Sequence, residues 1–171
     1  MHTEIPGSEV SFASPAIDWN NQWDFLKIAD SCDYLFIMGY AFAGSWSDVT
    51  GPTAPINGGS RNLSSLLKDP RDYGEVVQKK RDKLILGVPY YGCRWQTATE
   101  QPQSSVEKFI NYPRLKDAIS QSLEYTPSWD MVSKTPWYSY KKNEKWRQVW
   151  FENPESLFAK YQLAKDLSLI H

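Results

Sequence analysis

Long apolar runs and blocks of like charge are both missing from this chain. No apolar stretch approaches the roughly 18 to 20 residues of a bilayer-spanning helix, which argues against a membrane protein. The polar start, Met1–Pro6, has no signal-peptide core, and a processed or truncated amino terminus would look the same. The net charge of -1 arises from interspersed signs and gives no electrostatic footprint for nucleic acid or an anionic membrane, so neither partner is expected.

Side chains that bind metals or act as nucleophiles are also scarce. The two cysteines, Cys32 and Cys93, lie far apart and spell no zinc motif, so both are expected to be small buried hydrophobes. The two histidines, His2 and His171, sit at the chain ends, where a catalytic role is not expected. No P-loop or dinucleotide-binding glycine motif is present. The sequence therefore predicts no metal site and no cofactor.

Aromatic residues, by contrast, are abundant: they make up 15% of the 171 residues, with eight tryptophans and ten tyrosines. Trp and Tyr combine a flat apolar face with a polar edge, which suits sugar rings and protein surfaces. This richness favours a carbohydrate or protein partner, although any single tryptophan can equally be filling the core or its rim.

Two short apolar runs, Leu35–Tyr40 and Leu84–Gly92, are the most informative stretches. Each is too continuous for a half-exposed alternating strand and is typical of a buried parallel strand. Each also ends in hydrogen-bonding aromatic residues. Because ligands bind at the carboxyl ends of such strands, Tyr40, Tyr90 and Tyr91 are the first candidates for a binding site.

The first half of the chain alternates strands and helices. Strands are expected at Glu9–Pro15, Asp33–Tyr40 and Lys83–Tyr90, and helices at Trp23–Ala29 and, broken by Pro70, at Leu63–Lys80. This order implies parallel neighbouring strands joined by crossovers. The Gly, Ser, Thr and Pro-rich stretch Ala41–Asn62 is expected to be a long functional loop.

After Trp95 this alternation stops. Residues 96–150 are polar and aromatic-rich, with an expected helix at Tyr112–Gln121 and two antiparallel strands, Thr135–Tyr140 and Lys145–Phe151, joined by the turn Lys141–Glu144. We interpret them as an α+β insertion. Asn153 then caps a helix that starts at Pro154, and the chain stops where a further strand is expected.

Several of these segments match one known family. Met38–Tyr40 resembles the Met-x-Tyr that ends the sixth barrel strand of glycoside hydrolase family 18, the chitinase and chitobiase-like family. Gly87–Gly92 resembles the seventh strand's Gly-x-Pro-aromatic-Tyr-Gly, and Ser11–Pro15 is similar to the fifth strand. Residues 96–150 correspond to an insertion that members often carry after strand seven, and Phe151–Leu157 resembles the entry to the following helix. The resemblance covers nearly the whole chain and concerns the carboxy-terminal part of the family domain.

The resemblance implies an α/β fold that is part of a TIM (β/α)8 barrel, about strands five to seven with their helices. The partial barrel would comprise residues 8–95 and the insertion residues 96–150. Residues 151–171 would form a barrel helix leading to a missing strand. Cut strands leave uncovered edges and apolar faces, so self-association is expected.

The same resemblance implies a site for a glycan that contains N-acetylglucosamine. Family members use a substrate-assisted mechanism, in which the sugar's acetamido oxygen attacks its own anomeric carbon while an enzyme carboxylic acid protonates the leaving oxygen. Tyr40 would hydrogen-bond the acetamido group or the reacting sugar, with Met38 beneath it as a contact or as plain core filling. Tyr91 would line the same subsite, and Trp46 and Trp95 could stack on sugar faces.

Two departures from the family pattern affect function. The catalytic signature Asp-x-x-Asp-x-Asp-x-Glu is absent from the sequence. The nearest imitation, Asp69–Glu75, lacks the third acid and is better explained as a solvated turn. Ala41 stands where the family often has Asp, and a methyl group can neither accept a hydrogen bond nor shift a neighbour's pKa.

Three interpretations therefore stay open. The chain is a fragment of a family 18 glycosidase without its catalytic acid, a non-catalytic carbohydrate-binding or interaction module with the same type of fold, or an inactive excised fragment. Cytoplasmic and exported locations both stay open, with export favoured by the resemblance alone.

Overall fold

The computed structural model describes residues 5–170, which form two compact units. The first unit contains the described residues up to Gly39 together with Ser64–Gly87 and residues 161–170. The second contains Tyr40–Leu63 and Val88–Lys160. This division differs from the predicted one, because the loop that follows residue 40 belongs to the second unit and not to the strands that it connects.

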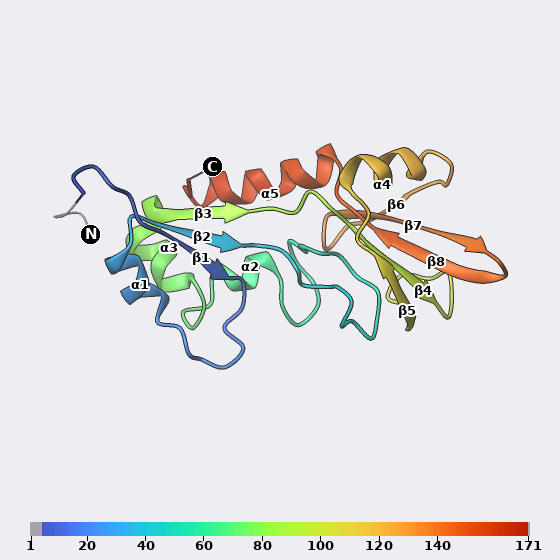
Figure 1. Ribbon diagram of the computed structural model, residues 1–171, viewed down its shortest axis with the longest axis horizontal. Helices are drawn as coiled ribbons and strands as arrows, with labels where there is room; N and C mark the ends of the chain where they lie inside the picture. The colour runs from blue at the N-terminus through green and yellow to red at the C-terminus, as the bar shows by residue number, and fades with distance from the viewer. Residues whose placement is uncertain (1–4, 171) are drawn as a thin grey trace. The chain divides into compact units, whose positions relative to one another are not determined.

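The first unit contains a three-stranded parallel sheet in the order β1-β2-β3 (Figure 1). The register pairs Ala13 with Phe36 and Phe36 with Ile85. The strands are shorter than predicted but lie within the predicted ranges: β1 is Ser11–Pro15, β2 is Tyr34–Met38 and β3 is Leu84–Gly87. The predicted parallel pairing is confirmed.

Helices α1 (Phe25–Ser31) and α3 (Gly74–Lys80) pack against each other in this unit. The Asp24 carboxylate caps α1 by accepting from the Lys27 backbone N–H at 3.0 Å. The break predicted at Pro70 is also present, because the segment forms two helices, α2 (Leu63–Leu66) and α3, the latter followed by a 3-10 turn.

The second unit contains a five-stranded antiparallel sheet in the order β5-β4-β8-β7-β6. Its strands are β4 (Cys93–Thr97), β5 (Val106–Asn111), β6 (Ser128–Asp130), β7 (Thr135–Lys142) and β8 (Lys145–Trp150). Only β7 and β8 were predicted. Strand β4, which begins three residues before the predicted start of the insertion at residue 96, also belongs to this sheet.

Each face of this sheet carries its own apolar cluster. On one face, helix α4 (Leu115–Ser122) contributes Ala118 to a cluster with Tyr138, Val149 and Phe151. On the other face, Trp95 and Trp150 pack with a residue of the 41–62 loop, Ala43. The predicted helix Tyr112–Gln121 is thus confirmed with a start three residues later.

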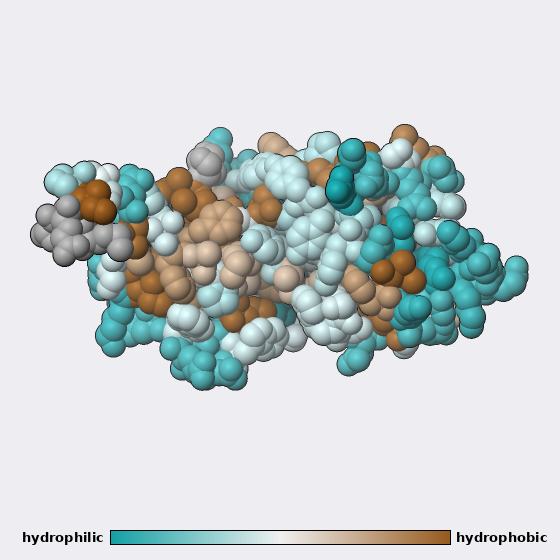
Figure 2. Space-filling view, in the orientation of Figure 1, coloured by the Kyte–Doolittle hydropathy of each residue, from teal (hydrophilic) through white to brown (hydrophobic). Residues whose placement is uncertain are grey.

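The tip of the β7–β8 hairpin is hydrophilic (Figure 2). Lys141, Lys142 and Lys145 are exposed there, and the Lys141 ammonium lies 5.0 Å from the ring centre of Trp146. This end of the sheet therefore faces water.

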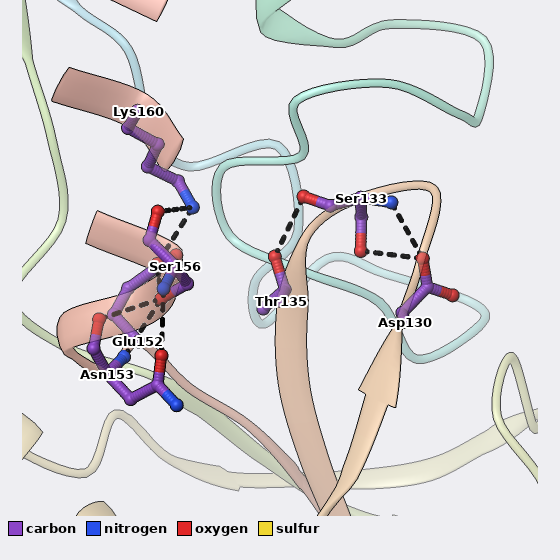
Figure 3. A network of polar contacts seen from close by, with 7 residues as sticks. All are labelled: Asp130, Ser133, Thr135, Glu152, Asn153, Ser156 and Lys160. Carbon is purple, nitrogen blue, oxygen red and sulfur yellow. Dashed lines mark hydrogen bonds and ion pairs between the residues drawn. The ribbon is translucent and has the colours of Figure 1, made fainter. Parts of the chain in front are cut away.

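Helix α5 (Pro154–Asp166) begins in the second unit, and its last residues belong to the first. The predicted cap is confirmed: the Asn153 side-chain oxygen accepts from the Ser156 backbone N–H at 2.8 Å. A buried ion pair joins this helix to the residue two positions before it: Lys160 Nζ is 2.8 Å from Glu152 Oε2, and neither side chain is exposed (Figure 3). Burial raises the pKa of Glu152 and lowers that of Lys160, and their mutual attraction opposes both shifts.

The chain then returns to the parallel sheet. Ile170 forms a parallel bridge with Ile85, and its backbone N–H donates to Leu84 O at 2.8 Å. The end of the described chain therefore lies beside β3 in strand-like pairing. No helix among residues 5–170 has the length and apolarity that crossing a membrane requires.

Candidate functional site

An open hollow of about 300 Å³ lies in the second unit, lined by Ala41, Trp46, Tyr91 and Tyr112. Two of these residues come from the 41–62 loop and two from segments next to β4 and β5. The lining is aromatic and carries no charged side chain. A hollow of this kind suits the flat face of a neutral ring.

The tyrosine rings at this site meet edge to face. The Tyr40 and Tyr91 ring centres are 6.3 Å apart at 78°, and those of Tyr91 and Tyr112 are 5.7 Å apart at 86°. This geometry matches the preferred arrangement of aromatic pairs, with the positive edge of one ring directed at the negative face of the other. The structure thus brings together Tyr40 and Tyr91, as the sequence predicted.

Burial raises the pKa of Tyr91 to about 12, with smaller contributions from Cys93, Tyr112 and Tyr40. A hydrogen bond with the Ala41 backbone acts in the opposite direction. The phenol is therefore neutral across physiological pH, where it can donate a hydrogen bond to a ligand oxygen but cannot act as a base.

Ala41 adopts a left-handed conformation with φ of 63°. A residue with a Cβ rarely adopts this conformation, and holding it costs about 1–2 kcal/mol. Its exposed methyl group lines the hollow where the related family often has a carboxylate. The wall at this point is therefore apolar and uncharged.

The 41–62 loop is attached to the antiparallel sheet along its length. The Thr50 backbone N–H donates to Ser104 O at 3.0 Å, and Val49 bridges Ser105. Further along, the Ile56 backbone N–H donates to Ser133 O at 3.1 Å. These contacts satisfy some backbone groups of a long irregular segment and hold it against the residues that precede β5 and β7.

Trp46 is 61% exposed, and its indole lies against the backbone of Gly44. A Cβ at Gly44 would be 2.5 Å from the ring, so only glycine allows this approach without moving the ring. That Trp46 offers a face to a ligand stays a prediction, and its exposed position at the hollow is compatible with it.

Trp95 corrects one prediction, because it is fully buried and cannot stack on a sugar. It lies in the cluster with Cys93 and Trp150, on the face of the sheet that packs with Ala43. Its indole N–H donates to Gly44 O at 3.1 Å. The sequence pattern placed it in a loop after the third strand, whereas it sits at the middle of β4.

The other predicted residues fall as follows. Tyr90 is 57% exposed and is not among the residues that line the hollow. Met38 ends β2 in the first unit and is half-buried. Cys93 is buried, as predicted, and burial raises its thiol pKa to about 12. Cys32 is partly buried, and both thiols are free.

Sequence reasoning missed Tyr112. It was placed at the start of a helix, whereas it follows β5 and precedes α4. No periodicity marks it, and only the abundance of aromatic residues hinted that another ring would join the site. Residues 5–170 contain no group of three side chains that could hold a metal ion.

Comparison with known proteins gives this site its context. Residues 6–169 match the family description "Glycosyl hydrolases family 18". The chain belongs to glycosyl hydrolases family 18. The resemblance read from the strand motifs is therefore confirmed.

Among its relatives, human di-N-acetylchitobiase is 28% identical over 94% of this chain and 45% of the relative. Among solved structures, the Ostrinia furnacalis Group IV chitinase has a TM-score of 0.77 and 22% identity, covering 98% of this chain and 50% of the other. A Cycas revoluta chitinase in complex with (GlcNAc)3 has a TM-score of 0.74 and 21% identity, covering 94% of this chain and 47% of the other. The chain spans about half the length of the curated relatives it matches.

Proposed function

We propose that this chain forms part of a site for glycans that contain N-acetylglucosamine, in a protein related to chitinases and chitobiases. The observation that carries the proposal is the uncharged aromatic hollow lined by Ala41, Trp46, Tyr91 and Tyr112. A neutral sugar ring has apolar C–H faces that stack on indole and phenol rings, and hydroxyl and acetamido groups that hydrogen-bond to the ring edges. Membership of the family supports this choice over other flat ligands.

The proposed architecture is three consecutive strands of a (β/α)8 barrel, β1 to β3, with the antiparallel sheet as an insertion after the third. The parallel order β1-β2-β3 and the parallel bridge of Ile170 to Ile85 support it. In that arrangement Tyr40 and Tyr91 follow the carboxyl ends of adjacent strands, where barrel enzymes bind their substrates.

The intact parent protein would hydrolyse its glycan by the substrate-assisted retaining route. There, the acetamido oxygen of the sugar forms a bond to the anomeric carbon as the bond to the leaving oxygen breaks, and a carboxylic acid protonates that oxygen. Tyr40 and Tyr91 are suited to orient the acetamido group, since a neutral phenol donates a hydrogen bond. The acid itself is not among the residues of this chain that line the hollow. Loss of general acid catalysis typically lowers rates by about 10²- to 10⁴-fold.

A second candidate is a carbohydrate-binding module without catalysis. Ala41 favours it, because its methyl group lines the hollow where family members often carry an acid. Both candidates require sugar binding, and they differ only in whether a longer protein carries the acidic motif.

The test is titration of the purified chain with tri-N-acetylchitotriose, followed by tryptophan fluorescence. We expect saturable binding that Trp46→Ala weakens and Trp19→Ala leaves unchanged, since Trp19 is a 74% exposed tryptophan of the other unit. Absence of binding to the wild-type chain, or equal effects of the two variants, would refute the proposed site.

The same preparation should not hydrolyse a fluorogenic chitobioside. Turnover that Glu75→Gln abolishes would restore the Asp69–Glu75 segment as a catalytic motif and would overturn its interpretation as a solvated turn.

A further inference from the structure

The peptide group between Gly44 and Ser45 is held on both sides by aromatic side chains. Its carbonyl oxygen, Gly44 O, accepts from Trp95 Nε1 at 3.1 Å. Its N–H, from Ser45, donates to the Tyr112 hydroxyl at 3.1 Å. We call Trp95 and Tyr112 the aromatic clamp. All of these residues lie in the second unit.

Neighbouring rings support both clamp side chains. Trp95 has no exposed surface and packs with Cys93 and Trp150, in the cluster on the Ala43 face of the sheet. The Phe109 ring contacts both clamp residues, with centres 6.4 Å from Trp95 and 4.7 Å from Tyr112. Trp95, packed in this way, has few alternative rotamers. Tyr112 is 42% exposed, and the Tyr91 and Phe109 rings support it from the protein side, so its hydroxyl is directed at the loop.

The clamped peptide group immediately precedes Trp46. The turn is closed by Ser47, whose hydroxyl accepts from the Gly44 N–H at 3.0 Å and whose N–H donates to Gly44 O at 3.2 Å. The Trp46 indole lies against the Gly44 backbone, within the distance that a Cβ would occupy. Fixing the backbone at Gly44 and Ser45 therefore fixes the surface on which this ring rests.

We propose that Trp95 and Tyr112 are positioning residues that hold Trp46 as a preformed stacking surface at the hollow. Its sugar-binding consequence rests on the proposed function, whereas the ordering of the loop does not. An exposed tryptophan on a free loop would lose conformational freedom on binding, and that loss weakens affinity. The clamp orders the loop before a ligand binds, so this loss of conformational freedom is avoided. The antiparallel sheet, which carries Trp95, therefore affects the affinity of the site.

The test is Tyr112→Phe, which keeps the ring and removes only the hydroxyl. We expect the Ser45 amide to exchange with deuterium roughly three- to tenfold faster, because a single neutral hydrogen bond is lost. Trp46 emission, taken as the difference from a Trp46→Phe background, should shift toward that of a mobile indole. Tri-N-acetylchitotriose should bind about threefold more weakly. Tyr125→Phe, a hydroxyl deletion on the other face of the same sheet, should change none of these.

The outcomes separate this proposal from the proposed function. If the wild-type chain does not bind the trisaccharide, the proposed function fails, and amide exchange together with Trp46 emission still decides the clamp. Unchanged exchange at Ser45 in Tyr112→Phe overturns the proposal. Faster exchange with unchanged Trp46 emission also overturns it, since the hydrogen bond would then be structural alone.

Discussion

Gly44 shows how one residue without a side chain shapes the site. A Cβ there would lie 2.5 to 2.8 Å from the Trp46 indole, and the exposed ring would have to move away. We expect Gly44→Ala to weaken trisaccharide binding by about three- to tenfold, on the scale of one lost aromatic contact. The free energy of unfolding should change by less than about 1 kcal/mol, because the displaced ring is largely solvated. Gly51→Ala is the matched control, since nothing lies within 4 Å of its Cβ position; a similar loss of binding in both variants would contradict this explanation.

The buried pair of Glu152 and Lys160 gives a second prediction at this scale. Removing one member of a buried pair leaves an uncompensated charge, so Lys160→Met should lower the free energy of unfolding at pH 7 by about 3–5 kcal/mol. Part of that charge is already unsatisfied, because Glu152 Oε1 has no hydrogen-bond partner among the described residues. Chemical denaturation measures the loss, and Lys165→Met, at an exposed position of the same helix, should have little effect.

This variant should also change the pH dependence of stability. Burial raises the pKa of Glu152, and without the Lys160 ammonium nothing of opposite charge offsets that shift. An acid whose pKa is higher in the folded than in the unfolded state binds more protons when folded, so its destabilising effect fades as pH falls. The stability difference between Lys160→Met and the wild type should therefore shrink as the pH falls through the raised pKa of folded Glu152 toward the ordinary carboxyl value of the unfolded chain. A difference independent of pH would show that the pKa of Glu152 in the variant is not raised above its value in the unfolded chain.

Among the elements, the β7–β8 hairpin has the most readily tested turn. Lys142 pairs with Lys145, which leaves a two-residue loop, Asn143 and Glu144, with φ of 53° and 57°. Two-residue hairpin turns of this type favour Asn-Gly, because the left-handed conformation is unfavourable for residues with a Cβ. Glu144→Gly should therefore raise the free energy of unfolding by about 0.5–1 kcal/mol, measured by thermal denaturation. Glu144→Ala removes the same charge but keeps the Cβ; an equal gain in that control would assign the effect to charge.

The elements also show where sequence reasoning succeeds. The apolar runs predicted β2 and β3, and local capping chemistry predicted α5 at Asn153 and Pro154, because these signals depend on neighbouring residues. Strands β4, β5 and β6 were missed. The residues of β5 have no clear alternation, and the register with β4 is shifted by bulges. Strand β4 does alternate, with Cys93, Trp95 and Thr97 buried, but it is only five residues long and was taken as the end of the preceding segment.

At the scale of the whole molecule, we expect the isolated chain to self-associate. In the parallel sheet β1 is a terminal strand, and under the proposed barrel architecture further strands would pair with it and cover its apolar faces. A few hundred Å² of uncovered apolar surface, at about 25 cal/mol per Å², favours association by several kcal/mol. Sedimentation equilibrium should show a dimer or larger species.

The control for that experiment is Trp19→Ser, which removes a 74% exposed indole. Dissociation by this substitution would assign association to a single exposed side chain and not to the sheet. A well-folded monomer at high concentration, with a sharp thermal transition, would count against the partial barrel.

The sequence by itself determined the family, the parallel strands and the two tyrosines that follow them, because strand motifs and their terminal residues are local and lie in fixed order along the chain. Only the tertiary structure decided the rest of the site. It buried Trp95, brought Tyr112 to the hollow and attached the 41–62 loop to the antiparallel sheet. These arrangements depend on contacts between residues about 50 to 70 positions apart, such as Trp95 with Gly44 and Tyr112 with Ser45, and no local pattern of side chains encodes which distant backbone group a ring will bind.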